Sequence, residues 1–192
     1  SDLDPVHPLD VIMDAWNMTN SEGVVGSTTI CVATLDKKLG QLSYSNVGDG
    51  GLLVVSLATY LSQQQLRSFN LPYQLGFSNL PEAPGNFETP SDADTASISV
   101  LPGDIIILAT DGLFDNMDLD EIVKEVAAWE RGDAADHVDA LAEQLVQKAR
   151  LLSLDKNRDS PFALLAKEND VMWGGGMPDD TSVVVARVTR TP

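Results

Sequence analysis

The sequence has little basic charge and only two histidines. Lys and Arg number 12 against 29 Asp and Glu, which gives a net charge of −17. Proteins that bind nucleic acids or anionic lipid surfaces through electrostatics need clusters of basic side chains. This sequence offers none, so we expect neither a nucleic-acid partner nor a membrane-surface partner.

Cysteine and long apolar runs are also scarce. The single cysteine, Cys31, excludes an internal disulfide bond, and we expect it to be a buried core thiol because free cysteine packs as a small hydrophobe. No apolar run approaches the roughly 20 residues that span a bilayer, so no transmembrane segment is predicted. We expect no signal or transit peptide in the first residues of the given sequence, which therefore says nothing direct about compartment.

Enough apolar material is present for a folded core. Hydrophobic residues make up 43% of the 192 residues, a length that suits a single domain over 1–192. Residue patterns predict strands over Val24–Leu35, Leu42–Val47, Leu52–Leu57, Thr95–Leu101, Ile105–Ala109 and Thr181–Val188. They predict helices over Leu9–Met18, after the Asp118/Glu121 capping box, over Val138–Leu152 and after Ser160-Pro161. The partial segregation of strands and helices favours an α+β fold with antiparallel sheets.

Two glycine- and proline-rich segments interrupt this pattern. Gly48-Asp49-Gly50-Gly51 separates two predicted strands, which indicates a hairpin between them. Gln63–Asp94 has no periodicity and is punctuated by proline and glycine. Loops of this length are often functional, so we expect a long loop or a small irregular subdomain here.

Several aspartates lie at positions suited to chemistry. Asp111 follows the apolar strand Ile105–Ala109 and precedes a glycine, which lets a ligand approach closely. Asp115 comes four residues later, Asp49 lies in the glycine-flanked turn, and Asp179 precedes the last strand. Carboxylates without Cys or His partners suit hard cations such as Mg²⁺ or Mn²⁺. Two such cations would form a hydrolytic site that activates water and holds a phosphoryl group.

Competing motifs fail on specific residues. Gly174–Gly176 is followed by Met177-Pro178 and not by the Lys-Ser/Thr of a P-loop. The EF-hand-like start at Asp155 has Ala166 where the bidentate glutamate belongs. A haloacid dehalogenase motif would place its nucleophile at Ala109, which has no carboxylate. No Ser, Cys or Lys nucleophile constellation is visible.

Taken together, four segments resemble signatures of the metal-dependent type 2C (PPM) Ser/Thr protein phosphatases, and they occur in the order that the family has. These segments are Gly26-Ser27-Thr28-Thr29, Asn46-Val47-Gly48-Asp49-Gly50, Ala109 to Met117 (ATDGLFDNM) and Gly174 to Val183 (GGGMPDDTSV). Phe69 to Leu75 (FNLPYQL) and Ser160 to Ala163 (SPFA) resemble the organellar branch of that family. The branch implies a mitochondrial or chloroplast location.

The resemblance implies a fold and a set of ligands. The fold is two packed antiparallel sheets with helices on both outer faces. Asp111 and Asp179 match ligands of a catalytic Mn²⁺ or Mg²⁺, while Asp49 and Asp115, with Asp111, match ligands of a weaker third ion. Asp180 matches a position next to the ligands. The loop over 62–90 matches a flap beside the active site.

The resemblance also implies an activity. The expected function is hydrolysis of phosphoserine and phosphothreonine in phosphoprotein substrates by a metal-activated water, without a covalent intermediate. The family's upstream Asp-Gly motif, whose aspartate bridges two catalytic ions, has no counterpart in Ser1 to Val25, and Gly50 stands where Ser is usual. We therefore expect a catalytic domain that is incomplete at its N-terminus and inactive by itself. The alternative is a pseudophosphatase that serves as a binding or scaffold module.

Overall fold

A computed structural model describes residues 6–78 and 87–190 of the chain. The chain divides into two compact units, one made of Ser1–Gly50 with Gln63–Leu101 and the other of Gly51–Ser62 with Pro102–Pro192. Within the described ranges, no helix has the length and apolar character that crossing a membrane requires.

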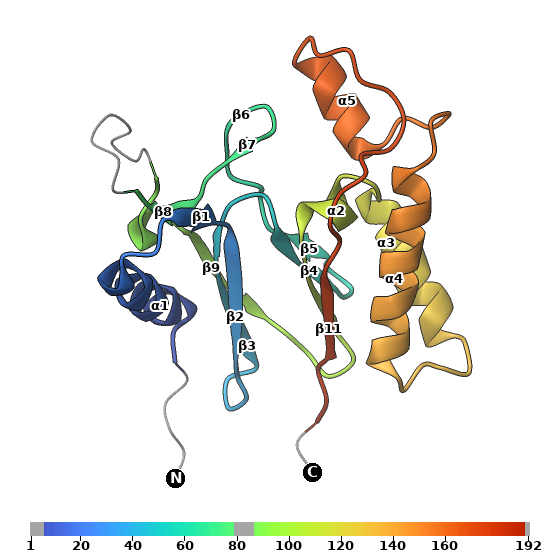
Figure 1. The fold of residues 1–192 in the computed structure, drawn as a ribbon. Coiled ribbons are helices and arrows are strands. Elements are labelled where there is room, and N and C mark those ends of the chain that lie inside the picture. Colours follow the sequence, from blue (N-terminus) through green and yellow to red (C-terminus); the bar gives the residue numbers. More distant parts are fainter. Residues whose placement is uncertain (1–5, 79–86, 191–192) are drawn as a thin grey trace. The chain divides into compact units, whose positions relative to one another are not determined.

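The first unit is built on a three-stranded antiparallel sheet with the order β2-β3-β9 (Figure 1). Helix α1 packs against β2 and β3, and its Ile12 is fully buried beside Val47 and Leu75. The helix begins after His7, whose Nδ1 accepts a hydrogen bond from the Leu9 N–H. The elements of this unit are α1 (Pro8–Glu22), β1 (Gly26–Thr28), β2 (Ile30–Asp36), β3 (Gln41–Val47), β6 (Leu66–Ser68), β7 (Leu71–Pro72), β8 (Leu75–Phe77), the 3₁₀ helix η1 (Pro90–Asp92) and β9 (Asp94–Ser99).

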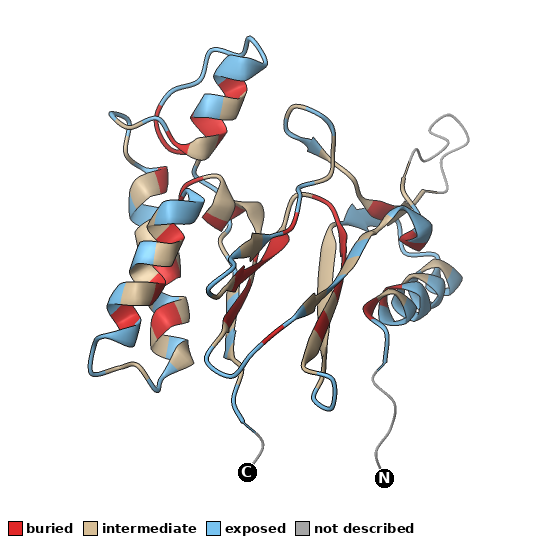
Figure 2. Ribbon diagram, turned by 180° about the vertical axis from the view of Figure 1, so that it is seen from behind, coloured by how far each residue is buried: buried red, intermediate tan, exposed pale blue. Residues whose placement is uncertain are grey.

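The second unit is built on a four-stranded antiparallel sheet with the order β11-β10-β4-β5. Its core joins the apolar strands to the apolar stripes of α3 and α4, which Figure 2 shows as buried segments facing the sheet. Leu53, Ile107, Ile122 and Leu145 are all fully buried in this core. The elements are β4 (Gly51–Val55), β5 (Tyr60–Leu61), β10 (Ile105–Ala109), α2 (Asp111–Phe114), α3 (Leu119–Glu130), α4 (Val138–Ser153), α5 (Pro161–Glu168) and β11 (Val183–Arg187).

The predicted α+β class with antiparallel sheets is confirmed, as are the predicted helices and most strands. The predicted strand over Val24–Leu35 is divided at Thr29 into β1 and β2. Cys31 lies in β2 and is half-buried, less enclosed than the core thiol that we expected.

The predicted hairpin between the strands that flank Gly48 to Gly51 is wrong. β3 pairs on one side with β2 and on the other with β9, while β4 pairs with β10 and β5. A strand has only two edges for hydrogen bonding, so neither strand has an edge left for the other. The glycine-rich turn therefore connects two different sheets.

The segment over 62–90, where we expected a long loop or a small irregular subdomain, contains short strands, although its residues 79–86 lie outside the described part. β6 and β7 form a hairpin, and β8 pairs with β1. Glu88 holds this region together, because its carboxylate pairs with the Arg67 guanidinium at 2.5 Å and accepts a hydrogen bond from the Gln74 N–H at 2.7 Å.

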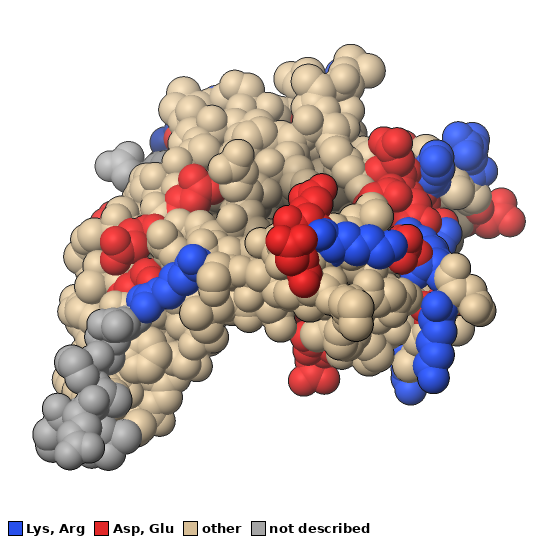
Figure 3. Space-filling model, turned by 90° about the horizontal axis from the view of Figure 1, so that it is seen from above, with Lys and Arg blue, Asp and Glu red and all other residues tan. Residues whose placement is uncertain are grey.

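Basic side chains are distributed among acidic ones. On the face shown in Figure 3 the drawn Lys and Arg side chains lie beside Asp and Glu and form no continuous basic patch. Ion pairs at 2.5 Å join Arg158 to Glu121 and Lys148 to Glu125. Gln144 also donates a hydrogen bond to Glu125. The hydrogen bond from Lys148, and to a lesser extent that from Gln144, lowers the pKa of the Glu125 carboxyl.

Candidate metal centre

Pairing of β10 with β11 brings two of the predicted ligands to one end of the second unit's sheet. The strands are antiparallel, and Ala109, the last residue of β10, is opposite Val183, the first residue of β11. Asp111 follows β10 and Asp179 precedes β11, so both leave the sheet at the same end. Asp111 is half-buried and Asp179 is exposed.

Thr110 fastens the two segments together at this end. Its hydroxyl donates to the Asp180 carbonyl at 3.0 Å and accepts from the Ser182 N–H at 3.0 Å. Its own N–H donates to the Ser182 carbonyl at 3.1 Å. These hydrogen bonds fix the backbone just before Asp111 and just after Asp179.

Gly112 permits the close approach that this arrangement requires. A Cβ at this position would lie 2.6 Å from the Asp180 carbonyl oxygen and 2.7 Å from the Thr181 hydroxyl oxygen. Since real Cβ atoms do not approach that closely, any side chain here would push the segment before β11 away. The glycine after Asp111 therefore makes room for the protein's own backbone at this site.

Asp115 joins the same end of the unit through the short helix α2. Asp111 is the first residue of α2 and Asp115 ends it, with the Asp115 N–H donating to the Asp111 carbonyl at 2.7 Å. The Asp115 carbonyl in turn accepts from the Phe162 N–H at 3.1 Å, which ties α2 to α5. Three of the four predicted ligands thus belong to one end of the second unit.

Asn116 is a site residue that sequence reasoning did not single out. It is fully buried, and its amide nitrogen donates to the carbonyls of Gly112 at 3.0 Å and Met177 at 2.8 Å. Its Oδ1 accepts from the Met177 N–H at 2.8 Å. The side chain therefore clamps α2 to the segment that leads to Asp179. Its place inside Ala109 to Met117, a segment that resembles a phosphatase signature, was the one available signal.

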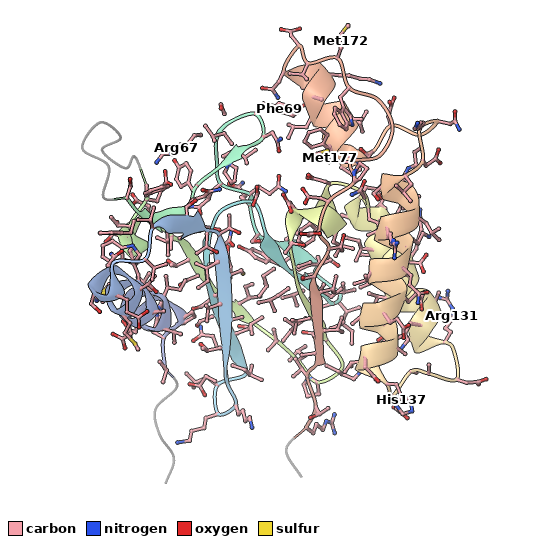
Figure 4. All side chains as sticks on the ribbon, in the orientation of Figure 1. Arg67, Phe69, Arg131, His137, Met172 and Met177 are labelled. Atoms are coloured by element: carbon pink, nitrogen blue, oxygen red, sulfur yellow. The ribbon has the colours of Figure 1, made fainter. Side chains whose placement is uncertain are left out.

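The glycines before Asp179 pack closely against the end of α4. Gly175 and Gly176 are buried, and the Gly176 N–H donates to the Asp155 carbonyl at 2.8 Å. A Cβ on Gly176 would overlap with the carbonyl groups of Leu152 and Ser153 at the end of α4. Figure 4 shows Met177 where the chain returns from α5 toward β11.

Asp179 and Asp180 differ in their contacts. Both are exposed, and the Asp180 N–H donates to Asp179 Oδ1 at 2.7 Å. Asp180 also contributes the carbonyl that Thr110 binds. Asp180 thus orients its neighbour through its backbone.

Asp49 belongs to the first unit, in the turn after β3. The Gly48 N–H donates to Gln65 Oε1 at 3.2 Å, and the Gly48 carbonyl accepts from the Gln65 N–H at 2.9 Å. Buried Asn46 also donates to that carbonyl at 3.1 Å. Gly48 has φ of +119°, a conformation that favours glycine. Asp49 therefore follows a tightly held turn.

The donor set fits a hard divalent cation. Aspartate oxygens are the ligands that Mg²⁺ and Mn²⁺ prefer, and neither His nor Cys is among the predicted ligands. Over residues 6–78 and 87–190, no group of three or more His, Cys, Asp and Glu side chains is arranged to hold a metal ion.

Comparisons with known proteins agree on one kind of protein. The family described as "Stage II sporulation protein E (SpoIIE)" matches residues 2–189. "Protein phosphatase PTC7 homolog fig" of Drosophila virilis is 34% identical over 97% of this chain and 62% of its own length. "Protein phosphatase PTC7 homolog" of Danio rerio is 35% identical over 97% of this chain and 64% of its own length.

A solved structure is also similar along most of the chain. The X-ray structure of the photosystem II phosphatase PBCP superimposes with a TM-score of 0.80 and 31% sequence identity, over 96% of this chain and 72% of that one. PppA, a regulatory component of the type VI secretion system of Pseudomonas aeruginosa, shares the fold with a TM-score of 0.52 and 19% identity, over 94% of this chain and 66% of that one. The chain spans 62–64% of the length of the two curated relatives named above.

Proposed function

Because this chain belongs to the SpoIIE family of type 2C phosphatase domains, we propose that the protein hydrolyses phosphoserine and phosphothreonine in phosphoprotein substrates with Mn²⁺ or Mg²⁺. One observation carries the proposal. Asp111 and Asp179 are 68 positions apart in the sequence, yet they leave paired strands at the same end of one sheet. A shared cation explains why carboxylates would be gathered there.

The proposed ligand set follows the resemblance residue by residue. By that resemblance, Asp111 and Asp179 hold one of two catalytic ions, and Asp115, with Asp111, contributes to a weaker third ion. When bound, such ions lower the pKa of a coordinated water and offset charge that develops on a phosphoryl group. The two relatives are named protein phosphatases, which supports this reading over a scaffold without catalysis.

The chain's own residues contribute positioning. Thr110 and Asn116 hold the segments next to Asp111 and Asp179, so the backbone that carries these carboxylates is fixed by the chain's own hydrogen bonds. Ligands held by surrounding hydrogen bonds bind with less loss of conformational freedom. Gly112 allows these segments to lie so close together that no larger side chain would fit at its position.

Regulation and location are parts of the same proposal. We propose that residues 1–192 belong to one catalytic domain and that the segment over 62–90 is a flap that influences substrate choice. We also propose an organellar location, mitochondrial or plastid, and similarity to a photosystem II phosphatase supports the plastid.

The test compares the given chain with a chimera. In the chimera, the parts of the Danio rerio relative that lie outside the matched region are joined to this chain. Both are assayed on a phosphothreonine peptide with Mn²⁺. We expect turnover by the chimera and none by the chain alone. Asp111→Asn in the chimera should lower kcat at least about 100-fold, because a neutral amide is a weak ligand. The control is Asp133→Asn, an exposed residue in the turn between α3 and α4. Unchanged activity of the Asp111 variant would refute the assignment.

A further inference from the structure

Residues 160–176 of the second unit form a closed segment that contains α5 and ends just before Met177 (Figure 4). Its two ends meet, because the Ser160 N–H donates to the Gly175 carbonyl at 3.3 Å. Ser160 is fully buried and caps α5, its hydroxyl accepting from the Ala163 N–H at 3.1 Å. The motif Ser160 to Ala163 thus begins a segment whose start and end are held side by side.

Each end of this segment is attached to a stretch that carries a proposed metal ligand. At the start, the Phe162 N–H donates to the Asp115 carbonyl at 3.1 Å, and the Phe162 side chain is buried. At the end, only three positions separate Gly176 from Asp179. Contacts between the two ends of the segment therefore restrain the backbones of Asp115 and Asp179 together.

Trp173 makes such contacts from within the segment. Its ring packs edge-on against the Phe162 ring, with centroids 5.5 Å apart and planes at 80°, an arrangement that aromatic pairs prefer. Its indole Nε1 donates to the Gly176 carbonyl at 3.3 Å. One side chain thus contacts both Phe162, which binds the Asp115 carbonyl, and Gly176, which leads to Asp179. Met172, the residue before it, is fully exposed.

We propose that Trp173 is a positioning residue for the candidate metal centre, because through Phe162 and Gly176 it holds the backbones of Asp115 and Asp179 in place. The inference rests on the proposed function, whose metal ligands it concerns. Groups that orient metal ligands from behind typically change metal affinity about 10–100-fold when they are removed. Loss of the Trp173 side chain should therefore weaken ion binding more than it slows turnover once the ions are bound.

Hydrogen exchange of the whole 192-residue chain, measured by NMR, tests the restraint without any activity. Trp173→Ala should make the amides of Phe162 and Gly176 exchange at least about tenfold faster, while the Ile122 amide in α3 changes less than about twofold. A general loss of stability would instead speed exchange at all three amides. Met172→Ala is the matched control, and it should change none of them.

A conservative variant keeps the test decisive if Trp173→Ala fails to fold. Trp173→Phe retains an aromatic ring that can pack against Phe162 and loses the hydrogen bond to the Gly176 carbonyl. It should speed exchange at Gly176 about threefold and leave exchange at Phe162 within about twofold of the parent.

Calorimetric titration of the chimera with Mn²⁺ tests the effect on the ions. Trp173→Ala should weaken Mn²⁺ binding about tenfold and change kcat at saturating Mn²⁺ less than about threefold. Met172→Ala should change neither. If the parent chimera bound Mn²⁺ without hydrolysing the phosphothreonine peptide, the proposed function would fail, and the Mn²⁺ affinities would still decide the role of Trp173.

Three results would overturn the role of Trp173. They are unchanged exchange at Phe162 and Gly176, equal Mn²⁺ affinity of the Trp173→Ala variant and the parent, and an effect of Met172→Ala as large as that of Trp173→Ala. Absence of Mn²⁺ uptake by the parent chimera would overturn this role and the proposed function together.

Discussion

Cys31 shows at the scale of one residue how position in a sheet sets side-chain chemistry. It lies in β2, and in the antiparallel register its Cα is opposite that of Asn46 in β3, which in turn is opposite Asp94 in β9. Burial, aided by the negative charge of Asp94, raises the pKa of the Cys31 thiol from 9.0 to about 12. At neutral pH the thiol is therefore protonated and acts as a small apolar side chain and not as a nucleophile.

The first prediction concerns this thiol. At pH 8, alkylation of Cys31 by iodoacetamide in the folded chain should be on the order of 1,000-fold slower than in concentrated urea, because only the thiolate reacts. The raised pKa means that the folded state favours the protonated thiol. Its contribution to stability is full below about pH 9 and is lost as the pH rises toward 12.

Mass spectrometry measures the alkylation rate, and urea unfolding measures the pH dependence. A Cys31→Ala variant is the control, since its stability should fall less between pH 9 and 12 than that of the parent. Equal alkylation rates in the folded and unfolded chain would contradict the shift.

Local signals in the sequence were sufficient at the scale of helix ends and strand ends. The capping box of Asp118 and Glu121 and the cap at Ser160 appear as predicted, because each involves residues only three apart. The placement of Asp111 after a buried strand was predictable for the same reason. The hairpin after β3 was mispredicted because a turn sequence does not determine which strands pair. The partners of Asn116 were also hidden, since Met177 is 61 residues away.

The second prediction tests the clamp between α2 and the segment before β11. Asn116→Ala removes three hydrogen bonds and leaves the buried polar backbone of Gly112 and Met177 with fewer partners. At about 1 kcal/mol for each bond, the free energy of unfolding should fall by about 2–3 kcal/mol. Urea unfolding followed by circular dichroism measures the change.

A matched variant separates this clamp from a general effect of losing asparagine. Asn157→Ala changes an exposed asparagine in the turn between α4 and α5, and it should alter the free energy of unfolding by less than about 0.5 kcal/mol. If both variants unfolded at the same urea concentration as the parent, the hydrogen bonds of Asn116 would contribute nothing and the clamp would be refuted.

Charge is the dominant property at the scale of the whole molecule. A net charge of −17 opposes the folded state through self-repulsion, because folding brings like charges closer together. Some acidic groups are offset locally, as Glu88 is by Arg67 and Asp159 by Lys167. With 29 acidic and only 12 basic residues, most carboxylates cannot have a basic partner. The same excess attracts divalent cations, so a specific metal effect must be separated from general screening.

The third prediction concerns this repulsion. Raising NaCl from about 10 mM to about 500 mM should raise Tm by roughly 5 °C, because the Debye length shortens from about 30 Å to about 4–5 Å and repulsion is screened. Choline chloride at equal ionic strength should give the same shift, since screening does not depend on the identity of the cation. Differential scanning calorimetry measures both. If Tm fell with NaCl, the attractive ion pairs would outweigh the repulsion. If Na⁺ stabilised the chain and choline did not, the effect would come from cation binding at a site and not from net charge.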